Sequence, residues 1–200
     1  MSSEHYYSKN PQSENITETK QVILNNHSFT FTMGAGVFSK KGIDFGTRLL
    51  IEHFQAPDHD GDILDLGCGY GPIGIALAHQ FPSREVLMTD INERAVSLAK
   101  QNAEQNDVTN VTVMQSEGFL KIEEHIFATI VTNPPIRAGK TVVYNLFRDS
   151  KSHLVDGGEL WIVIQKKQGA PSAIKYLTSI FNEVETMTRK KGYYVIRTKK

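Results

Sequence analysis

Short apolar runs alternate with amphipathic stretches along most of the chain, and this alternation predicts the order of its elements. Runs rich in apolar and β-branched residues predict strands at 62–66, 85–89, 111–115, 127–132 and 158–164. Helical spacing predicts helices at 47–55, 73–80, 92–105, 141–153 and 172–180. Because strands that alternate with helices form βαβ crossovers, we predict an α/β fold with a doubly wound, mostly parallel sheet.

The two ends of the chain depart from this alternation. Two strand-like runs at 184–188 and 193–198 are linked by only four residues, too few for a crossover helix, so they form a C-terminal antiparallel hairpin and bring the sheet to seven strands. Runs at 21–24 and 28–33 flank Asn25-Asn26-His27, which predicts an N-terminal β-hairpin extension. We therefore expect an arm and hairpin over 1–45 and the main domain over 46–200.

Composition narrows the class of protein. The 200 residues include 40% apolar positions and equal numbers of acidic and basic residues, as in a globular domain. The single cysteine, Cys68, excludes a disulfide framework, and the seven histidines show no metal-ligand spacing, so we expect no metal. No apolar run approaches the ~20 residues of a membrane span and the N-terminus lacks a signal-peptide core, which favours a cytoplasmic protein.

The net charge of zero hides an asymmetry. Residues 161–200 hold nine Lys/Arg and two Glu, a net charge of +7, and the rest of the chain balances it. Segregation of this kind is typical of a nucleic-acid face, although a solvated basic edge would look the same.

A glycine-rich turn follows the first predicted strand of the sheet. Asp65-Leu66-Gly67-Cys68-Gly69-Tyr70-Gly71 leads into a helix that begins near Pro72, and Gly69, Gly71 and Gly74 also match a dinucleotide fingerprint. Asp90 ends the next strand, where a carboxylate can accept hydrogen bonds from ribose hydroxyls. A carboxylate at Asp65 suits a ligand with a cationic amino acid end and opposes a pyrophosphate.

A second motif, Asn133-Pro134-Pro135-Ile136, follows the apolar strand at 127–132. Two prolines fix their own φ and keep the preceding residue out of a helix, which makes a rigid loop. Such a loop can aim the Asn133 amide oxygen and the Pro134 carbonyl together, and two acceptors fit an amino group with two donors. Transfer to that nitrogen requires orientation more than it requires a strong base.

These motifs together resemble known families. The turn at Asp65 resembles the first motif of class I S-adenosylmethionine (AdoMet) methyltransferases, and Asn-Pro-Pro resembles that of amino-methyltransferases. The stretches at 36–47 and His5-Tyr6-Tyr7-Ser8 look like the small-domain ribosomal RNA guanine-N2 methyltransferases of the bacterial 16S type. The resemblance implies a Rossmann-like class I methyltransferase fold, AdoMet as cofactor, and N2 of a guanine in ribosomal RNA, or in an assembling ribosomal subunit, as target.

The resemblance also implies roles for individual residues. Asn133, Pro134 and Pro135 would act at the reacting amine, and Ile136, Arg137 and Lys140 would contact the substrate. The cofactor would be held by Asp65, Gly67, Cys68, Gly69, Gly71, Asp90, Ile91, Glu117, Gly118, Asn133 and Phe38. Many Asn-Pro-Pro enzymes continue with an aromatic residue that stacks on a flipped base. Since Ile136 stands there, stacking would come from Phe38 or Tyr144, or apolar contact with the base would replace it.

Other functions stay open on the sequence alone. Methylation of a protein glutamine amide or of adenine N6 would use the same Asn-Pro-Pro chemistry. The glycine spacing alone would also fit an NAD-dependent oxidoreductase, and a module that binds RNA without catalysis would keep the same fold. A single domain of this size can act as a monomer, and the sequence leaves the oligomeric state undecided.

Overall fold

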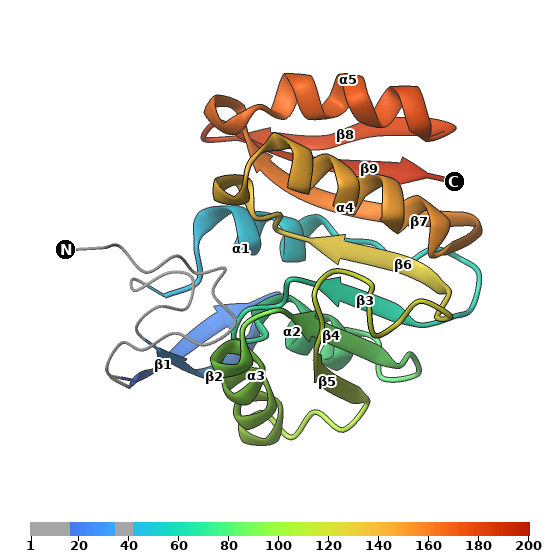
Figure 1. The fold of residues 1–200 in the computed structure, drawn as a ribbon. Helices are drawn as coiled ribbons and strands as arrows, with labels where there is room; N and C mark the ends of the chain where they lie inside the picture. Colours follow the sequence, from blue (N-terminus) through green and yellow to red (C-terminus); the bar gives the residue numbers. More distant parts are fainter. Residues whose placement is uncertain (1–16, 35–41) are drawn as a thin grey trace.

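A seven-stranded sheet forms the centre of the computed structural model, which describes residues 17–34 and 42–200 (Figure 1). Its strands lie in the order β5-β4-β3-β6-β7-β9-β8. They are β3 (Ile63–Leu66), β4 (Val86–Asp90), β5 (Val111–Gln115), β6 (Phe127–Thr132), β7 (Leu154–Gln165), β8 (Glu183–Lys190) and β9 (Tyr193–Lys199). The first five run parallel and β9 runs antiparallel to both β7 and β8, so the predicted fold and its C-terminal hairpin are confirmed.

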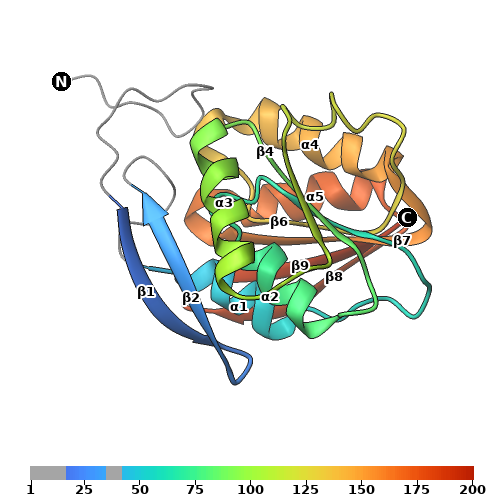
Figure 2. The ribbon, with the colours of Figure 1, turned by 90° about the horizontal axis from the view of Figure 1, so that it is seen from below.

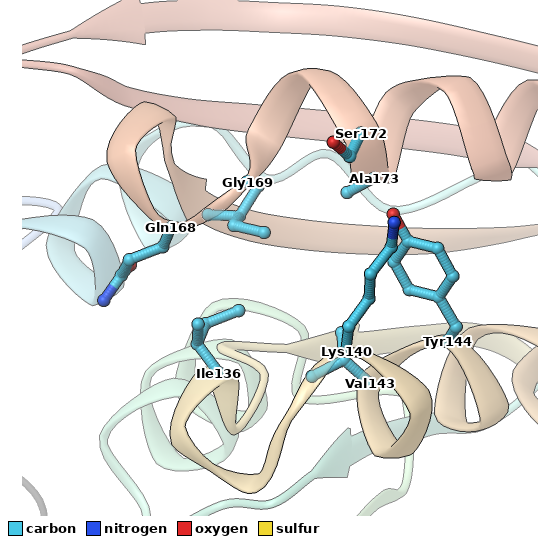
Figure 3. Close-up of a pocket in the computed structure, with 9 residues that line it drawn as sticks. Ile136, Lys140, Val143, Tyr144, Gln168, Gly169, Ser172 and Ala173 are labelled. Atoms are coloured by element: carbon cyan, nitrogen blue, oxygen red, sulfur yellow. The ribbon is translucent and has the colours of Figure 1, made fainter.

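Helices cover both faces of the sheet, and each face has its own apolar core. One core is shared by α1 (Phe45–His53), α2 (Pro72–Gln80) and α3 (Glu93–Gln105), and the other by α4 (Lys140–Ser152) and α5 (Ala170–Ile180). Trp161 is fully buried in the first core, as its apolar strand predicted. Two short 3₁₀ helices, η1 (Ile136–Ala138) and η2 (Lys166–Gln168), precede α4 and α5 and face each other across a hollow (Figure 3).

The order of the strands locates the ligand-binding edge. The chain moves outward in one direction from β3 through β4 to β5, then returns to the other side of β3 for β6 and β7. Ligands of doubly wound sheets bind beyond the carboxyl ends of the strands at such a reversal of order. Here that point lies between the glycine turn after β3 and the Asn-Pro-Pro turn after β6.

A separate two-stranded hairpin, β1 (Thr17–Leu24) and β2 (His27–Gly34), stands beside α3 (Figure 2). Asn25 and Asn26 both have positive φ, at 45° and 64°, which confirms the tight turn predicted from the asparagines. Phe29 and Phe31 are buried in the same core as α1–α3. The predicted boundary at 45/46 falls inside α1 and stays a prediction.

The predicted ends of the elements differ from the observed ones in places. β1 begins at Thr17 instead of 21, because polar Thr17–Lys20 pair with β2 along an exposed ribbon that carries no alternating apolar signal. β7 begins at Leu154 instead of 158, and α5 at Ala170 instead of 172, with Pro171 in its first turn. No helix of the described residues is both long and apolar enough to cross a membrane.

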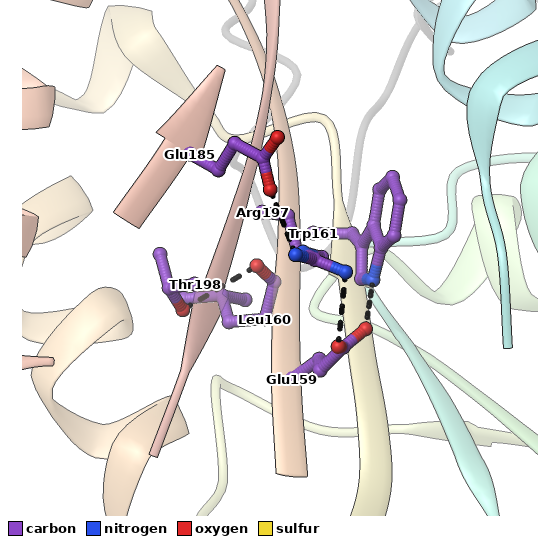
Figure 4. A network of polar contacts seen from close by, with 6 residues as sticks. All are labelled: Glu159, Leu160, Trp161, Glu185, Arg197 and Thr198. Atoms are coloured by element: carbon purple, nitrogen blue, oxygen red, sulfur yellow. Dashed lines mark hydrogen bonds and ion pairs between the residues drawn. The ribbon is translucent and has the colours of Figure 1, made fainter. Parts of the chain in front are cut away.

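A buried carboxylate joins the last three strands of the sheet (Figure 4). Glu159 is 6% exposed; its Oε2 accepts from the Trp161 indole nitrogen at 2.9 Å, and its Oε1 lies 3.6 Å from Arg197. Arg197 also pairs with Glu185 on β8 at 2.7 Å. The guanidinium therefore compensates the charge of Glu159 and links β7 to β8 through β9.

Arg197→Met is expected to lower the free energy of unfolding by about 1–3 kcal/mol, because it leaves a buried carboxylate without its cation. Denaturant unfolding measures the change. Arg148→Met is the matched control, since Arg148 pairs with its exposed neighbour Asp149 and such pairs contribute roughly 0–1 kcal/mol. Equal losses in the two variants would contradict the role given to Arg197.

Candidate active site

The glycine turn is fastened to the neighbouring strand by its backbone. The amides of Gly67 and Cys68 both donate to the Thr89 carbonyl of β4, at 2.8 and 2.9 Å. Gly67 has a φ of +76°, and a Cβ built there would meet no atom of the described residues within 4 Å. The backbone of the turn at Gly67 is therefore open to close approach by a ligand.

Asp65 is completely buried at the end of β3. Its Oδ2 accepts from the Gly74 amide at 2.8 Å, whereas its buried Oδ1 has no hydrogen-bond partner in the part of the chain that the structure describes. Burial raises the pKa of Asp65 from 3.8 to about 7; the Gly74 hydrogen bond opposes this rise and the Asp90 carboxylate adds to it. An unsatisfied buried acceptor of this kind fits a cationic donor supplied by a ligand.

Gly74 makes the contact with Asp65 possible. A Cβ at this position would lie 2.3 Å from the Met88 sulfur and 3.1 Å from Asp65 Oδ2. The last glycine of the fingerprint thus brings the helix against the strand and the carboxylate, a packing role that does not require a dinucleotide.

Asp90 is buried at the end of β4 and organises the next loop. Its Oδ2 accepts from Gly69 and its Oδ1 from Asn92, each at 2.9 Å. Asn92 in turn caps α3, with its side chain accepting from the amides of Arg94 and Ala95. These backbone bonds hold the carboxylate in one orientation at the carboxyl end of β4.

The other predicted cofactor residues lie beside these two. Ile91 follows β4, and its carbonyl accepts from Gln115 at the end of β5. Glu117 is exposed just beyond β5, and Gly118 follows with a φ of +55°. Cys68 and Gly71 are buried within the turn, and burial raises the pKa of the Cys68 thiol well above its usual range. Phe38 lies outside the described residues.

Asn133 follows β6, next to β3, and its amide orientation is fixed by two neighbours. Its nitrogen donates to Thr47 Oγ1 at 3.0 Å and lies 3.5 Å from Asp44 Oδ2. An ionised carboxylate only accepts, so the nitrogen must face Asp44. The amide oxygen is therefore turned to the opposite side, where it has no partner in residues 17–34 and 42–200.

The prolines complete this turn. Pro134 is buried, and its carbonyl accepts from the Ile136 amide at 2.9 Å, which leaves one lone pair. The Pro135 carbonyl accepts from Ala138 and starts η1. Thr132 Oγ1 donates to the Leu66 carbonyl at 2.7 Å and so ties the Asn-Pro-Pro turn to the glycine turn.

The sequence did not reveal the partners of Asn133. Asp44 is the N-cap of α1, with Oδ1 accepting from the amides of Gly46 and Thr47 at 2.9 and 3.1 Å. Its second oxygen then faces Asn133. An acidic residue before a helical stretch is a signal for a cap, but nothing in the pattern indicates the distant asparagine.

Ile136 and Lys140 line a hollow of about 270 Å³ between η1–α4 and η2–α5, with Gln168 and Ser172 opposite (Figure 3). The Tyr144 ring also lines it and stacks on Tyr176 with 4.2 Å between centroids. Tyr144 is one of the two residues predicted to stack on a base, and Tyr176 already covers one face of its ring. Arg137 is exposed beside the hollow.

No group of three or more His, Cys, Asp or Glu side chains in the described part of the chain is placed to hold a metal ion. The predicted absence of a metal stays a prediction. Two buried carboxylates, Asp65 and Asp90, lie at the site, and each accepts from backbone amides.

Comparison with known proteins identifies relatives. Residues 28–197 match the family described as "Methyltransferase small domain". The Bacillus subtilis protein YbxB, described only as uncharacterized, is 56% identical over 199 residues, 99% of both chains. Ribosomal RNA large subunit methyltransferase G of Klebsiella pneumoniae is 31% identical over 160 residues, which are 76% of this chain and 42% of that protein.

Among solved structures, the 16S rRNA guanine-N2 methyltransferase RsmC of Thermus thermophilus, in complex with AdoMet and guanosine, has a similar fold. The TM-score is 0.83 at 24% identity, over 95% of this chain and 52% of that one. The chain thus spans about half the length, or less, of these two ribosomal RNA methyltransferases, and nearly the whole of YbxB.

Proposed function

The chain belongs to the methyltransferase small-domain family, and we propose that it transfers a methyl group from AdoMet to N2 of a guanine in ribosomal RNA. One observation carries this proposal: an unpaired buried carboxylate oxygen of Asp65 and the outward-facing amide oxygen of Asn133 lie at the carboxyl ends of the adjacent strands β3 and β6. The first suits the ammonium of the donor and the second suits the amine that receives the methyl group.

The residues of the glycine turn fit AdoMet. Asp65 Oδ1 would accept from the amino acid ammonium, Asp90 would accept from the ribose hydroxyls, and Gly67 would leave room for close approach. Ile91, Glu117 and Gly118 would border the adenine. When bound, AdoMet supplies an electrophilic methyl group on its sulfonium.

The Asn-Pro-Pro turn would hold the amine. Asn133 Oδ1 and the remaining lone pair of the Pro134 carbonyl would each accept one N–H of the exocyclic amino group. The nitrogen is thereby oriented for in-line attack, and holding it accounts for most of the rate because orientation replaces a bimolecular encounter. The nitrogen loses one proton to water as it gains the methyl group, and the electron pair of the broken carbon–sulfur bond would stay on the sulfur of the donor.

Thr47→Val is expected to lower kcat about 5- to 10-fold, because Asn133 loses the acceptor that holds its amide, a bond of about 1–1.5 kcal/mol. The KM for AdoMet should stay near its original value, since Thr47 acts here through Asn133. Steady-state kinetics separates the two constants. Thr47→Ser keeps the hydroxyl and should restore kcat, and failure of this rescue would contradict the positioning role.

Ribosomal RNA is favoured as substrate by the relatives named above and by the basic C-terminal region. Ile136, Arg137 and Lys140 would contact it. The main alternative is a protein glutamine amide, which the same turn could hold.

Labelled AdoMet offered with ribosomal RNA and, separately, with a protein extract tests the choice, with both substrates taken from cells that lack this protein. Label in RNA is the expected result, and label only in protein would contradict it. In a thermal-shift assay AdoMet, but not NAD, should raise the melting temperature. Stabilisation by NAD alone would favour an oxidoreductase.

A further inference from the structure

The turn between β8 and β9 lies at the same edge of the sheet as the carboxyl end of β6 (Figure 1), which Asn133 directly follows. β7 runs parallel to β6, so both strands end at this edge. β9 runs antiparallel to β7, with Tyr193 opposite Gln165, which brings the β8–β9 turn back beside the end of β7. The Lys166 amide donates to the Gly192 carbonyl at 2.7 Å and joins η2 to that turn.

Three segments at this edge carry only positive charges. Residues 133–140, 165–169 and 188–192 contain seven Lys or Arg and no Asp or Glu. They are neighbours in space: Ile136 and Lys140 share a hollow with Gln168, and Lys166 and Lys167 share a second, open hollow of about 440 Å³ with Gly192. A continuous cationic strip thus runs from the Asn-Pro-Pro turn across η2 to the β8–β9 turn.

The five cations at the far end of this strip are exposed. They are Lys166, Lys167, Arg189, Lys190 and Lys191. Within residues 17–34 and 42–200, none of them forms an ion pair with a carboxylate. The Lys191 ammonium lies 4.8 Å from the Phe45 ring centroid, so this end of the strip is close to the preceding residue, Asp44. Asp44 does not form an ion pair with the strip, because its Oδ1 accepts from the Gly46 amide and its Oδ2 faces Asn133.

Crowded, unpaired cations repel one another and contribute little to folding. A polyanion relieves this repulsion, and a strip that extends over three segments of one edge suits successive phosphates rather than one small anion. We propose that Lys166, Lys167, Arg189, Lys190 and Lys191 bind the phosphates of the RNA strand that flanks the target guanine. This inference rests on the proposed function and names the surface that the substrate follows away from Asn133.

The test compares two double variants, Lys166→Gln/Lys167→Gln and Lys190→Gln/Lys191→Gln. Their affinity for a short fluorescein-labelled single-stranded RNA should fall about 10-fold at roughly 50 mM salt. The slope of log K against log salt should decrease by about 1.4, or about 0.7 for each phosphate that the protein no longer neutralises. The KM for ribosomal RNA should rise about 10-fold with kcat and AdoMet affinity unchanged.

Lys100→Gln/Lys175→Gln is the matched control, because both lysines are exposed and lie on helices α3 and α5. Their substitution removes the same charge as each test variant. An equal decrease of the slope in this control, or an unchanged slope in both test variants, would overturn the proposal. Competition by poly-glutamate as strong as by RNA would overturn the assignment to RNA. If the unaltered protein methylates RNA and the test variants have the same KM and salt dependence, only the RNA-binding role of the strip is contradicted. If the unaltered protein methylates no RNA, the proposed function itself is contradicted.

Discussion

Asn133→Ala is expected to lower kcat about 10²–10³-fold while AdoMet still binds. The loss is large because the amide oxygen would hold the reacting amine itself, and removal of one oriented group at a reaction centre has effects of this size. The surrounding structure should persist, since the half-buried Asp44 still accepts from the amides of Gly46 and Thr47 and so keeps the cap of α1. Single-turnover methyl transfer with saturating AdoMet measures the chemical step directly.

Asn145→Ala serves as the control for Asn133→Ala, because Asn145 is an exposed asparagine on α4. It should retain the original rate. A rate for Asn133→Ala within a few-fold of this control would show that the amine is held elsewhere. Loss of AdoMet binding in Asn133→Ala would instead place Asn133 in the cofactor site.

Asp65→Asn is expected to weaken AdoMet binding about 10- to 100-fold at pH 7.5, since a charge-assisted hydrogen bond contributes about 1.5–3 kcal/mol. The asparagine can still accept from Gly74, so the turn should keep its shape. Isothermal titration calorimetry measures the affinity. Unchanged affinity would contradict the role proposed for Asp65.

The same carboxylate predicts how binding depends on pH. Its pKa of about 7 means that the ligand-free site is largely neutral below that pH. Affinity for a cationic ligand should therefore rise about tenfold per pH unit up to pH 7 and level off above it, before the ligand's own amine loses its proton near pH ~7.7–8.0. Asp65→Asn should remove this dependence, and a flat profile in the unaltered protein would contradict the account.

The free energy of unfolding should also depend on the protonation of Asp65, but it should fall as the pH rises, whereas affinity for the ligand should increase. Since the folded-state pKa of about 7 lies above the ordinary 3.8, the folded protein binds this proton more tightly than the unfolded chain. The contribution of Asp65 to the free energy of unfolding therefore decreases as the pH rises from 3.8 to about 7. Ionised Asp65 therefore lowers the stability of the ligand-free protein, which agrees with a role in ligand binding rather than in folding.

Local patterns were sufficient to predict most of the fold. The apolar strands β3, β4, β6 and β7 are buried on both faces, so their composition indicates them directly. The turn at Asn25-Asn26 and the N-cap at Asn92 follow from single residues with strong conformational preferences. The family predicted from the glycine and Asn-Pro-Pro motifs is confirmed by the match over residues 28–197.

Contacts between distant segments could not be predicted in this way. Thr47 and Asn133 are 86 positions apart, and only the folded sheet brings α1 against the end of β6. The +7 region was visible in the sequence, but its meeting with Arg137 and Lys140 at one edge depends on the antiparallel return of β9. The roles of the individual site residues stay predictions until variants are measured.

The most direct test of the central claim is the identity of the methylated nucleoside. Ribosomal RNA from cells that lack this protein would be treated with the purified protein and labelled AdoMet, digested to nucleosides and analysed by mass spectrometry. The expected label lies in N2-methylguanosine alone, and Asn133→Ala should introduce about 10²–10³-fold less of it in the same time. Label in N6-methyladenosine, or in no nucleoside while AdoMet is bound, would contradict it.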